Sequence, residues 1–200
     1  MRQDILEVAT KREEAITYFG LDRTKKTVLV VGGSLGARTI NESMALCLDM
    51  LADEGTQLIW QTGKVYAQQG EKDAANKTNI KVLPFISRMD LAYAAADVVV
   101  SRAGASTISE LCLIGKPAIL VPSPNVAEDH QTKNAAALTD KNAALMVKDV
   151  RAKTELTEVL RELLQNEQKQ KELGENIQEL AKHQSAEKIA EEVIKLAQRT

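Results

Sequence analysis

Two glycine-containing segments, each between a strand pattern and a helix pattern, carry the residue types best suited to chemistry in this chain. Gly32–Ala37 reads GGSLGA, Ser101–Glu110 reads SRAGASTISE, and each follows a β-branched run. The start of a helix offers unpaired N–H groups and a partial positive charge of about half an elementary charge, which suits a phosphate. Glycine lets the backbone approach a ligand closely, because it has no Cβ. Two such turns on one sheet predict a site for a nucleotide diphosphate.

The first segment departs from the dinucleotide-binding motif G-x-G-x-x-G in its glycine spacing. Ser34 can donate its hydroxyl to a phosphate, and the amides of Leu35 and Gly36 lie at the predicted helix start. A dinucleotide site also needs an acidic residue at the end of the second strand, where this chain has Gln61–Gly63. A nicotinamide or flavin site is therefore disfavoured. Tight packing of the strand against the helix is the alternative for this turn.

The second segment adds hydroxyls and a carboxylate. Gly104 supplies the turn, while Ser106 and Thr107 can cap the helix that follows or contact a phosphate. Glu110 lies four residues after Ser106, on the same helical face. A carboxylate there can accept two hydrogen bonds from a ribose diol. The alternative for Glu110 is a solvated surface side chain.

A third polar segment, Pro122–Asn134, follows the fifth predicted strand. Gln131 and Asn134 can hydrogen-bond sugar hydroxyls without carrying charge. Ligands of open parallel sheets bind beyond the carboxyl ends of the strands, where this segment is expected. His130, a lone histidine beside Asp129, is expected to be structural or to contact phosphate or sugar, in preference to acting as a general base.

Short apolar strand patterns alternate with helix patterns along most of the chain. The predicted strands are Thr27–Val31, Gln57–Gln61, Ile80–Phe85, Asp97–Ser101, Ala118–Pro122 and Ala144–Val147. The predicted helices between them span about 37–53, 64–75, 87–96, 106–114 and 129–140. Such alternation is typical of right-handed βαβ units whose parallel sheet is covered on both faces. The sequence therefore predicts one α/β domain, doubly wound around a parallel six-stranded sheet.

Composition narrows the classes of partner. Hydrophobic residues make up 44% of the 200 residues, which is enough for a core of ordinary size. Aromatic residues make up only 3%, which argues against single-stranded nucleic-acid binding by base stacking. The formal net charge is −2 and basic residues do not cluster, so no nucleic acid is expected as a partner.

Several motifs for other chemistry are absent from the sequence. It contains no Asp-x-Asp, HExxH, CxxC or GxxxxGK[ST]. No metal and no cofactor is therefore expected, and amides, hydroxyls and helix dipoles would stabilise a diphosphate leaving group. Cys47 and Cys112 lie in helix patterns and are expected to be buried thiols in a reducing compartment. No signal peptide or membrane-spanning run is recognised, which predicts a cytoplasmic chain.

The two ends of the chain read differently from its centre. An approximate apolar stripe predicts a helix from about 4 to 19, ended by Gly20. Residues 151–200 are predicted to form C-terminal helices, with Gly174 interrupting the pattern. The last of them, at 185–198, presents one apolar face. It either docks on its own sheet or crosses to another domain.

Taken together, the motifs resemble the MurG family of bacterial N-acetylglucosaminyltransferases. GGSLGA followed by Arg38 and Asn41, then PFI at Pro84–Ile86, SRAGASTISE, GKPAILVP and DHQTKNA stand in the order and spacing of that family. The resemblance runs across nearly the whole chain but covers only the C-terminal half of the enzyme. It implies the Rossmann-like C-terminal domain of a GT-B fold, which holds UDP-GlcNAc. Residues 1–20 would then lead in from a missing N-terminal domain, toward which helix 185–198 would cross.

The resemblance also implies contacts to the nucleotide. Arg2 and Ser34 would contact the diphosphate, together with the turn at Leu35 and Gly36. The family often has Gln where this chain has Leu35, a change that a backbone contact tolerates. Ile86 would meet uracil through its backbone.

Further implied contacts involve the phosphate end, the ribose and the sugar. Ala105–Thr107 would line the start of the helix at the phosphates, and Glu110 would hold the ribose. Gln131 would bind GlcNAc hydroxyls, with Asn134 close by. A second Gln commonly follows the first in the family, and its place is taken here by Thr132, which puts one sugar contact in doubt.

The implied reaction is inverting transfer of GlcNAc from UDP-GlcNAc to lipid I, giving lipid II in peptidoglycan synthesis. The implied partners are UDP-GlcNAc, the N-terminal acceptor domain of the same enzyme, and lipid I through that domain. The full-length protein would lie on the cytoplasmic face of the inner membrane, and this chain alone would bind donor without transferring it. The alternatives are a non-catalytic nucleotide-sugar binding module and a UDP-GlcNAc 2-epimerase-like enzyme. A dehydrogenase is the weakest alternative.

Overall fold

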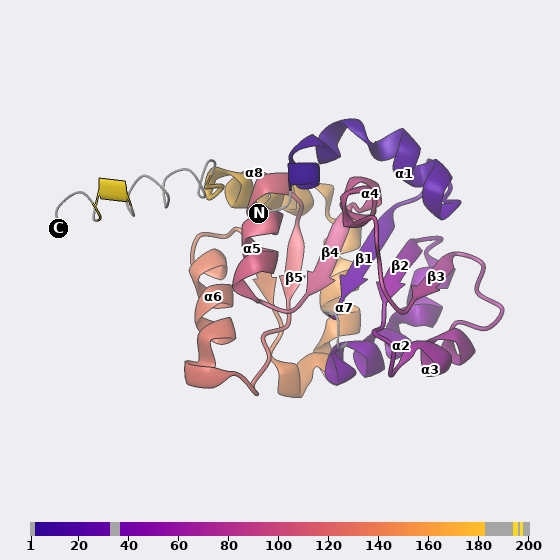
Figure 1. Ribbon diagram of the computed structural model, residues 1–200. Coiled ribbons are helices and arrows are strands. Elements are labelled where there is room, and N and C mark those ends of the chain that lie inside the picture. Colours follow the sequence, from indigo (N-terminus) through magenta and orange to yellow (C-terminus); the bar gives the residue numbers. More distant parts are fainter. Residues whose placement is uncertain (1–2, 33–36, 183–193, 196, 198–200) are drawn as a thin grey trace.

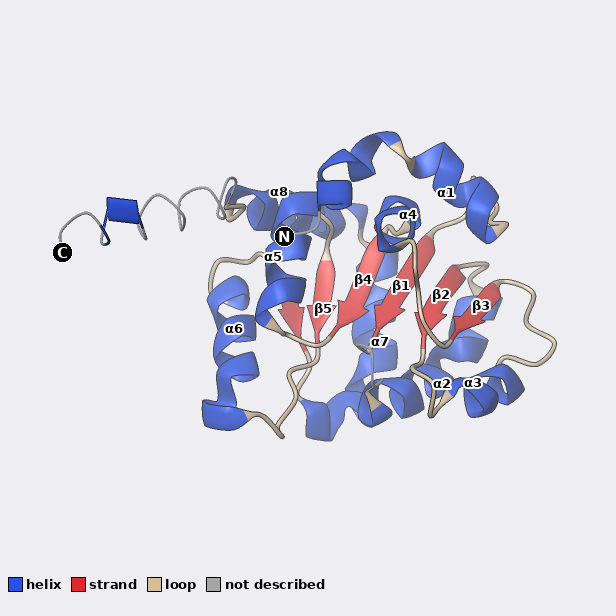
Figure 2. Ribbon diagram, in the orientation of Figure 1, coloured by secondary structure: helices blue, strands red, loops and turns tan. Residues whose placement is uncertain are grey.

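Six parallel strands form the centre of the computed structural model, which describes residues 3–32, 37–182, 194, 195 and 197 (Figures 1 and 2). The strands lie in the order β3-β2-β1-β4-β5-β6. Their bounds are β1 Thr27–Val31, β2 Gln57–Gln61, β3 Ile80–Leu83, β4 Val98–Ser101, β5 Ala118–Leu120 and β6 Leu145–Met146. All five neighbouring pairs are parallel. The expected α/β class and six-stranded parallel sheet are confirmed.

Strand ends are the places where the prediction and the structure differ most. β3 ends at Leu83 and not at Phe85, because Pro84 has no N–H to continue the ladder. β5 likewise ends at Leu120, before Pro122. The predicted strand Ala144–Val147 is reduced to Leu145–Met146 at the edge of the sheet.

Helices cover both faces of the sheet, so each face has its own apolar cluster. On one face lie α1 Arg12–Phe19, α4 Met89–Ala95, α5 Ala105–Ile114 and α6 His130–Thr139, and on the other lie α2 Arg38–Asp53, α3 Ala67–Asp73 and α7 Ala152–Gln165. In Figure 1, α4 is seen end-on near the upper ends of β4 and β1, α5 lies beside β5, and α7 passes behind the strands. α8, Glu167–Glu179, belongs to both clusters, with Ile177 in the first and Leu173 in the second. Short 3₁₀ segments at Ala127–Asp129 (η2) and Asp149–Arg151 (η3) precede α6 and α7.

The N-terminal segment is two helices, and the single helix expected over 4–19 is therefore wrong. A 3₁₀ helix, η1, runs from Gln3 to Thr10, and α1 begins at Arg12. Between them, Lys11 reaches the buried carboxylate of Asp90 on α4, with 3.1 Å from Nζ to Oδ2. This contact ties the segment to the body of the domain. α1 ends, as expected, at Gly20, which is left-handed (φ 61°).

Gly174 lies inside α8, so the expectation that it interrupts the helix is wrong. A Cβ at this position would stand 2.8 Å from the backbone oxygen of Gly115. The glycine therefore allows α8 to approach the end of α5 and does not mark a helix end. Of the predicted helix 185–198, the structure describes only Ile194, Lys195 and Ala197, which are helical and exposed. The rest of that prediction lies outside the described residues.

Candidate functional site

The strand order reverses between β1 and β4, and the two glycine turns follow these two strands. β1 pairs with β2 on one side and with β4 on the other, so the connections leave in opposite directions from this point. Ligands of open α/β sheets bind at such a reversal, beyond the carboxyl ends of the strands. Gly32 and Ala37 flank the first turn, while the predicted contacts Ser34, Leu35 and Gly36 lie outside the described residues, as does Arg2.

The start of α5 presents uncapped backbone amides. Gly104 occupies the N-cap position with extended backbone (φ −70°, ψ 148°), and no side chain accepts a hydrogen bond from the first turn. Ser106 and Thr107 therefore do not serve as caps, one of the two roles considered for them. Ala105 and Ser106 are exposed, and Thr107 is half-buried. This leaves N–H groups of the first turn available to an anionic ligand.

Glu110 is half-buried and held by a residue that the sequence analysis did not single out. The hydroxyl of Tyr93, on α4, donates to Oε2 of Glu110 at 2.9 Å. Tyr93 itself is only 1% exposed. A buried tyrosine hydroxyl needs a hydrogen-bond partner. Tyr93 has the only polar side chain in the apolar run Leu91–Ala96, and this position could have identified it from the sequence.

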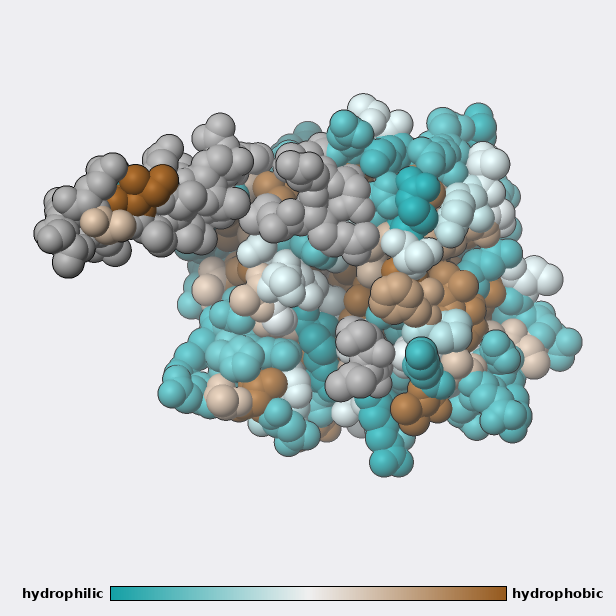
Figure 3. Space-filling view, viewed as in Figure 1, coloured by the Kyte–Doolittle hydropathy of each residue, from teal (hydrophilic) through white to brown (hydrophobic). Residues whose placement is uncertain are grey.

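Ile86 lies in the segment that leads from β3 to α4. The whole residue is 3% exposed, and it lines a cavity of about 280 Å³ that also contacts Tyr18, Phe19 and Lys81. Neither its amide nor its carbonyl has a hydrogen-bond partner in the described part of the chain. Both backbone groups are thus unpaired, although the residue as a whole is almost fully buried. The space-filling view shows the most apolar surface of this face gathered around this segment and β3 (Figure 3).

Gln131 and Asn134 anchor α6 to the ends of two strands. Oε1 of Gln131 accepts from the Ser123 amide at 2.9 Å, and Nδ2 of Asn134 donates to the Ala103 carbonyl at 3.1 Å. Asn134 and Ala105 line one groove of about 400 Å³ between α5 and α6. Both amides therefore hold the loops in place through one of their groups, which leaves Nε2 of Gln131 without a hydrogen-bond partner among the described residues.

The residues before α6 adopt unusual backbone. Glu128 and Asp129 have positive φ values of 54° and 52°, a conformation that favours glycine. The carboxylate of Asp129 accepts from Thr132 at 2.7 Å, and Nδ1 of His130 lies 2.8 Å from the carbonyl of Ala127. Consecutive strained residues often mark functional loops. His130 is exposed and engaged locally, in keeping with a structural role.

An ion pair that the sequence analysis missed joins three loops at the same end of the sheet. Arg102, in the RAG turn, donates to the Val121 carbonyl at 3.0 Å and pairs with Asp149 of η3. Asp149 also accepts from Thr39, in the first turn of α2, at 3.0 Å. Because the two charges are largely buried, the network fixes the loops after β4 and β5 to the start of α2. No spacing in the sequence relates Arg102 to a residue 47 positions later.

The described part of the chain shows neither a metal-binding cluster nor a membrane-spanning helix. Within the described ranges, no group of three or more His, Cys, Asp or Glu side chains is arranged to hold a metal ion. In the same ranges, none of the helices combines the length and the apolar character needed to cross a bilayer. The expectation that the site needs no metal or cofactor stays a prediction.

Comparison with known proteins identifies close relatives along the whole chain. A transferase from Bacteroides fragilis is 54% identical over 204 aligned residues, covering 100% of this chain and 54% of its own. One from Flavobacterium psychrophilum is 50% identical over 198 residues, covering 99% and 54%. Both are named UDP-N-acetylglucosamine--N-acetylmuramyl-(pentapeptide) pyrophosphoryl-undecaprenol N-acetylglucosamine transferase. The chain thus spans about half the length of these relatives.

The fold comparison agrees with the sequence comparison. The crystal structure of Acinetobacter baumannii MurG matches with a TM-score of 0.78 and 31% identity, over 98% of this chain and 55% of that one. Residues 27–193 match the family model described as "Glycosyltransferase family 28 C-terminal domain". The resemblance to the C-terminal half of MurG is therefore confirmed, and the chain belongs to the family of glycosyltransferase family 28 C-terminal domains.

Proposed function

We propose that this chain is the donor-binding half of an N-acetylglucosaminyltransferase, which holds UDP-GlcNAc while GlcNAc passes to lipid I to give lipid II. The observation that carries this proposal is the placement of the two glycine turns after β1 and β4, on either side of the strand-order reversal. A nucleotide diphosphate fits there, because backbone amides and helix dipoles from two directions converge on one anion. The printed names of the relatives supply the sugar and the acceptor.

Each part of the donor has a matching group in the proposed site. The amides at the start of α5, at Ala105–Thr107, suit the diphosphate, and so would Ser34 and Arg2. The unpaired amide and carbonyl of Ile86 complement the donor and acceptor groups of a uracil edge. The carboxylate of Glu110 suits the ribose diol, and Nε2 of Gln131 suits a GlcNAc hydroxyl.

In this proposal the transfer is an inverting displacement, as the family resemblance implies. The 4-hydroxyl of the lipid-linked MurNAc attacks the anomeric carbon of GlcNAc, the bond to the β-phosphate oxygen breaks, and UDP leaves. Amides and the α5 dipole stabilise the negative charge that develops on the diphosphate. The acceptor site, the general base and the contact with the cytoplasmic face of the membrane belong, in this proposal, to an N-terminal domain of the same enzyme.

Calorimetric titration of the 200-residue chain with UDP-GlcNAc, UDP, ADP-glucose and NAD tests the proposal. Binding of the two uridine ligands, with neither adenine ligand bound, is the expected result. Glu110→Ala should weaken UDP binding by about 1–3 kcal/mol, since a ribose hydrogen bond to a charged group is lost. NAD binding, or uridine binding that does not depend on Glu110, would contradict the assignment.

A further inference from the structure

We propose that Tyr93 is a positioning residue for the donor site, whose hydroxyl orients the Glu110 carboxylate toward the ribose of the ligand. This inference rests on the proposed function, because it assumes that Glu110 binds the ribose. Tyr93 would not touch the ligand. It would act by fixing where the oxygen atoms of Glu110 point before the ligand arrives.

The hydrogen bond between Tyr93 and Glu110 gives the two carboxylate oxygens different surroundings. The Tyr93 hydroxyl donates to Oε2 of Glu110 at 2.9 Å. Oε1 has no hydrogen-bond partner among the described residues. One oxygen is therefore tethered to the protein, and the other is left to accept from a ligand. An untethered glutamate would lose more rotamer freedom on binding, because its long side chain would have to be ordered at that moment.

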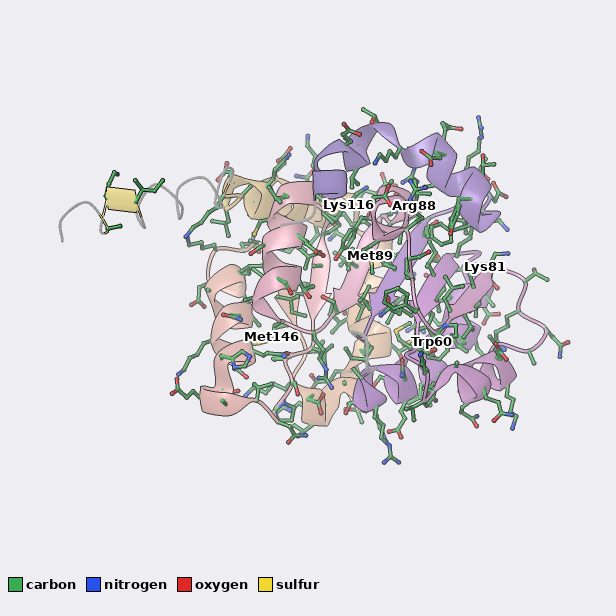
Figure 4. The ribbon with its side chains drawn as sticks, in the orientation of Figure 1. Trp60, Lys81, Arg88, Met89, Lys116 and Met146 are labelled. Carbon is green, nitrogen blue, oxygen red and sulfur yellow. The ribbon has the colours of Figure 1, made fainter. Side chains whose placement is uncertain are left out.

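The tyrosine is itself enclosed, which favours a positioning role. Every residue of α4 from Met89 to Ala95 is buried. The helix is held at its start by Asp90, whose carboxylate accepts from Arg88 at 2.9 Å and from Lys11 at 3.1 Å. Figure 4 shows Arg88 and Met89 at this end of α4, beneath the N-terminal segment. A rigid helix thus presents the hydroxyl at one fixed place.

The same helix also joins two parts of the proposed site. The segment that carries Ile86 leads into α4 within three residues, and Tyr93 lies one turn further along. The group proposed to meet the base and the group proposed to hold the ribose are consequently connected through α4 and one hydrogen bond. If Glu110 merely satisfied a buried hydroxyl, this connection would not exist. Removing that hydroxyl would then leave the affinity for UDP unchanged.

The test compares two ligands that differ only at the ribose. Tyr93→Phe keeps the buried ring and removes the hydroxyl, and calorimetry then gives the affinity for UDP and for 2′,3′-dideoxyuridine diphosphate. Affinity for UDP should fall roughly 5- to 20-fold, the effect of weakening one hydrogen bond to a charged group. Affinity for the dideoxy ligand should stay unchanged, which also reports that the variant is folded. Equal losses for both ligands, or no loss for either, would overturn the positioning role.

Two further variants separate this inference from the proposed function. Adding Tyr93→Phe to Glu110→Ala should cause no additional loss of UDP affinity, since there is no carboxylate left to orient. Tyr66→Phe is the matched control, because Tyr66 also donates to a carboxylate, that of Asp73, at 3.1 Å, and it should change neither affinity. If Glu110→Ala alone leaves UDP binding intact, the ribose role of Glu110 fails. If Glu110→Ala weakens binding and Tyr93→Phe does not, only the role of Tyr93 fails.

Discussion

At the scale of single residues, burial decides whether the two thiols of this chain are reactive. Burial raises the pKa of Cys47 to about 11, against a smaller opposing effect of its contact with Thr157. Burial likewise raises the pKa of Cys112. Because the thiolate is the nucleophile, neither residue should react with a disulfide reagent at pH 8 while the chain is folded. Absorbance after addition of dithionitrobenzoate measures this directly.

Urea-unfolded chain provides the control for that measurement, since both thiols should then react quickly and in equal amounts. Fast reaction in the native state would mean that one thiol lies in an electropositive, accessible setting. Cys112 would be the first candidate for such a reaction, because it lines the groove between α5 and α6, whereas Cys47 is enclosed between α2 and α7. Cys112→Ser would identify the residue responsible.

At the scale of elements, the N-terminal segment is attached to α4 through the carboxylate of Asp90. Hydrogen bonds from Arg88, and then from Lys11, hold the pKa of Asp90 well below its ordinary value of 3.8. A depressed folded-state pKa adds stability that is present above the unfolded value and lost as the pH falls toward the folded one. At pH 7, Asp90→Asn should therefore lower the free energy of unfolding by about 1.5–3 kcal/mol. The difference between variant and parent should shrink below about pH 4, as followed by urea unfolding.

An exposed ion pair of the same segment supplies the control for Asp90. Oε2 of Glu13 lies 2.6 Å from Nη2 of Arg23, and the side chains are 70% and 68% exposed. Glu13→Gln should change stability by roughly 0–1 kcal/mol, because solvent screens the pair. An Asp90 effect as small as this one, or one that persists unchanged at pH 3, would contradict the attachment of the N-terminal segment through Asp90.

Element type follows closely from sequence pattern here, while contacts between elements do not. Continuous β-branched runs such as Val98–Val100 predict buried parallel strands, and all six strands occur where expected. Lys11, where the N-terminal helix is interrupted, contacts Asp90, which lies 79 residues away. Gly174 could be read as a helix end because its tertiary neighbour, Gly115, is not visible in a local pattern.

The candidate site shows the same division between local and distant information. Glu110 and the glycine turns are recognisable in the sequence because the residues that indicate a binding site lie close together within one segment. Tyr93 and the pair of Arg102 with Asp149 are not, since each joins segments separated by a strand or more. Residues proposed to bind a ligand thus leave a local signal, and residues that hold the site in position leave almost none.

At the scale of the whole molecule, the chain carries the proposed donor site but spans only about half the length of the relatives named as transferases. Transfer requires an acceptor hydroxyl aligned within about 3–3.5 Å of the anomeric carbon. We therefore expect the 200-residue chain to bind UDP-GlcNAc and yet transfer no labelled GlcNAc to a lipid-linked MurNAc-pentapeptide. The full-length Bacteroides fragilis relative, assayed alongside, should transfer it. Turnover by the 200-residue chain alone would mean that the acceptor also binds within these residues, and the division of labour between two halves would have to be abandoned.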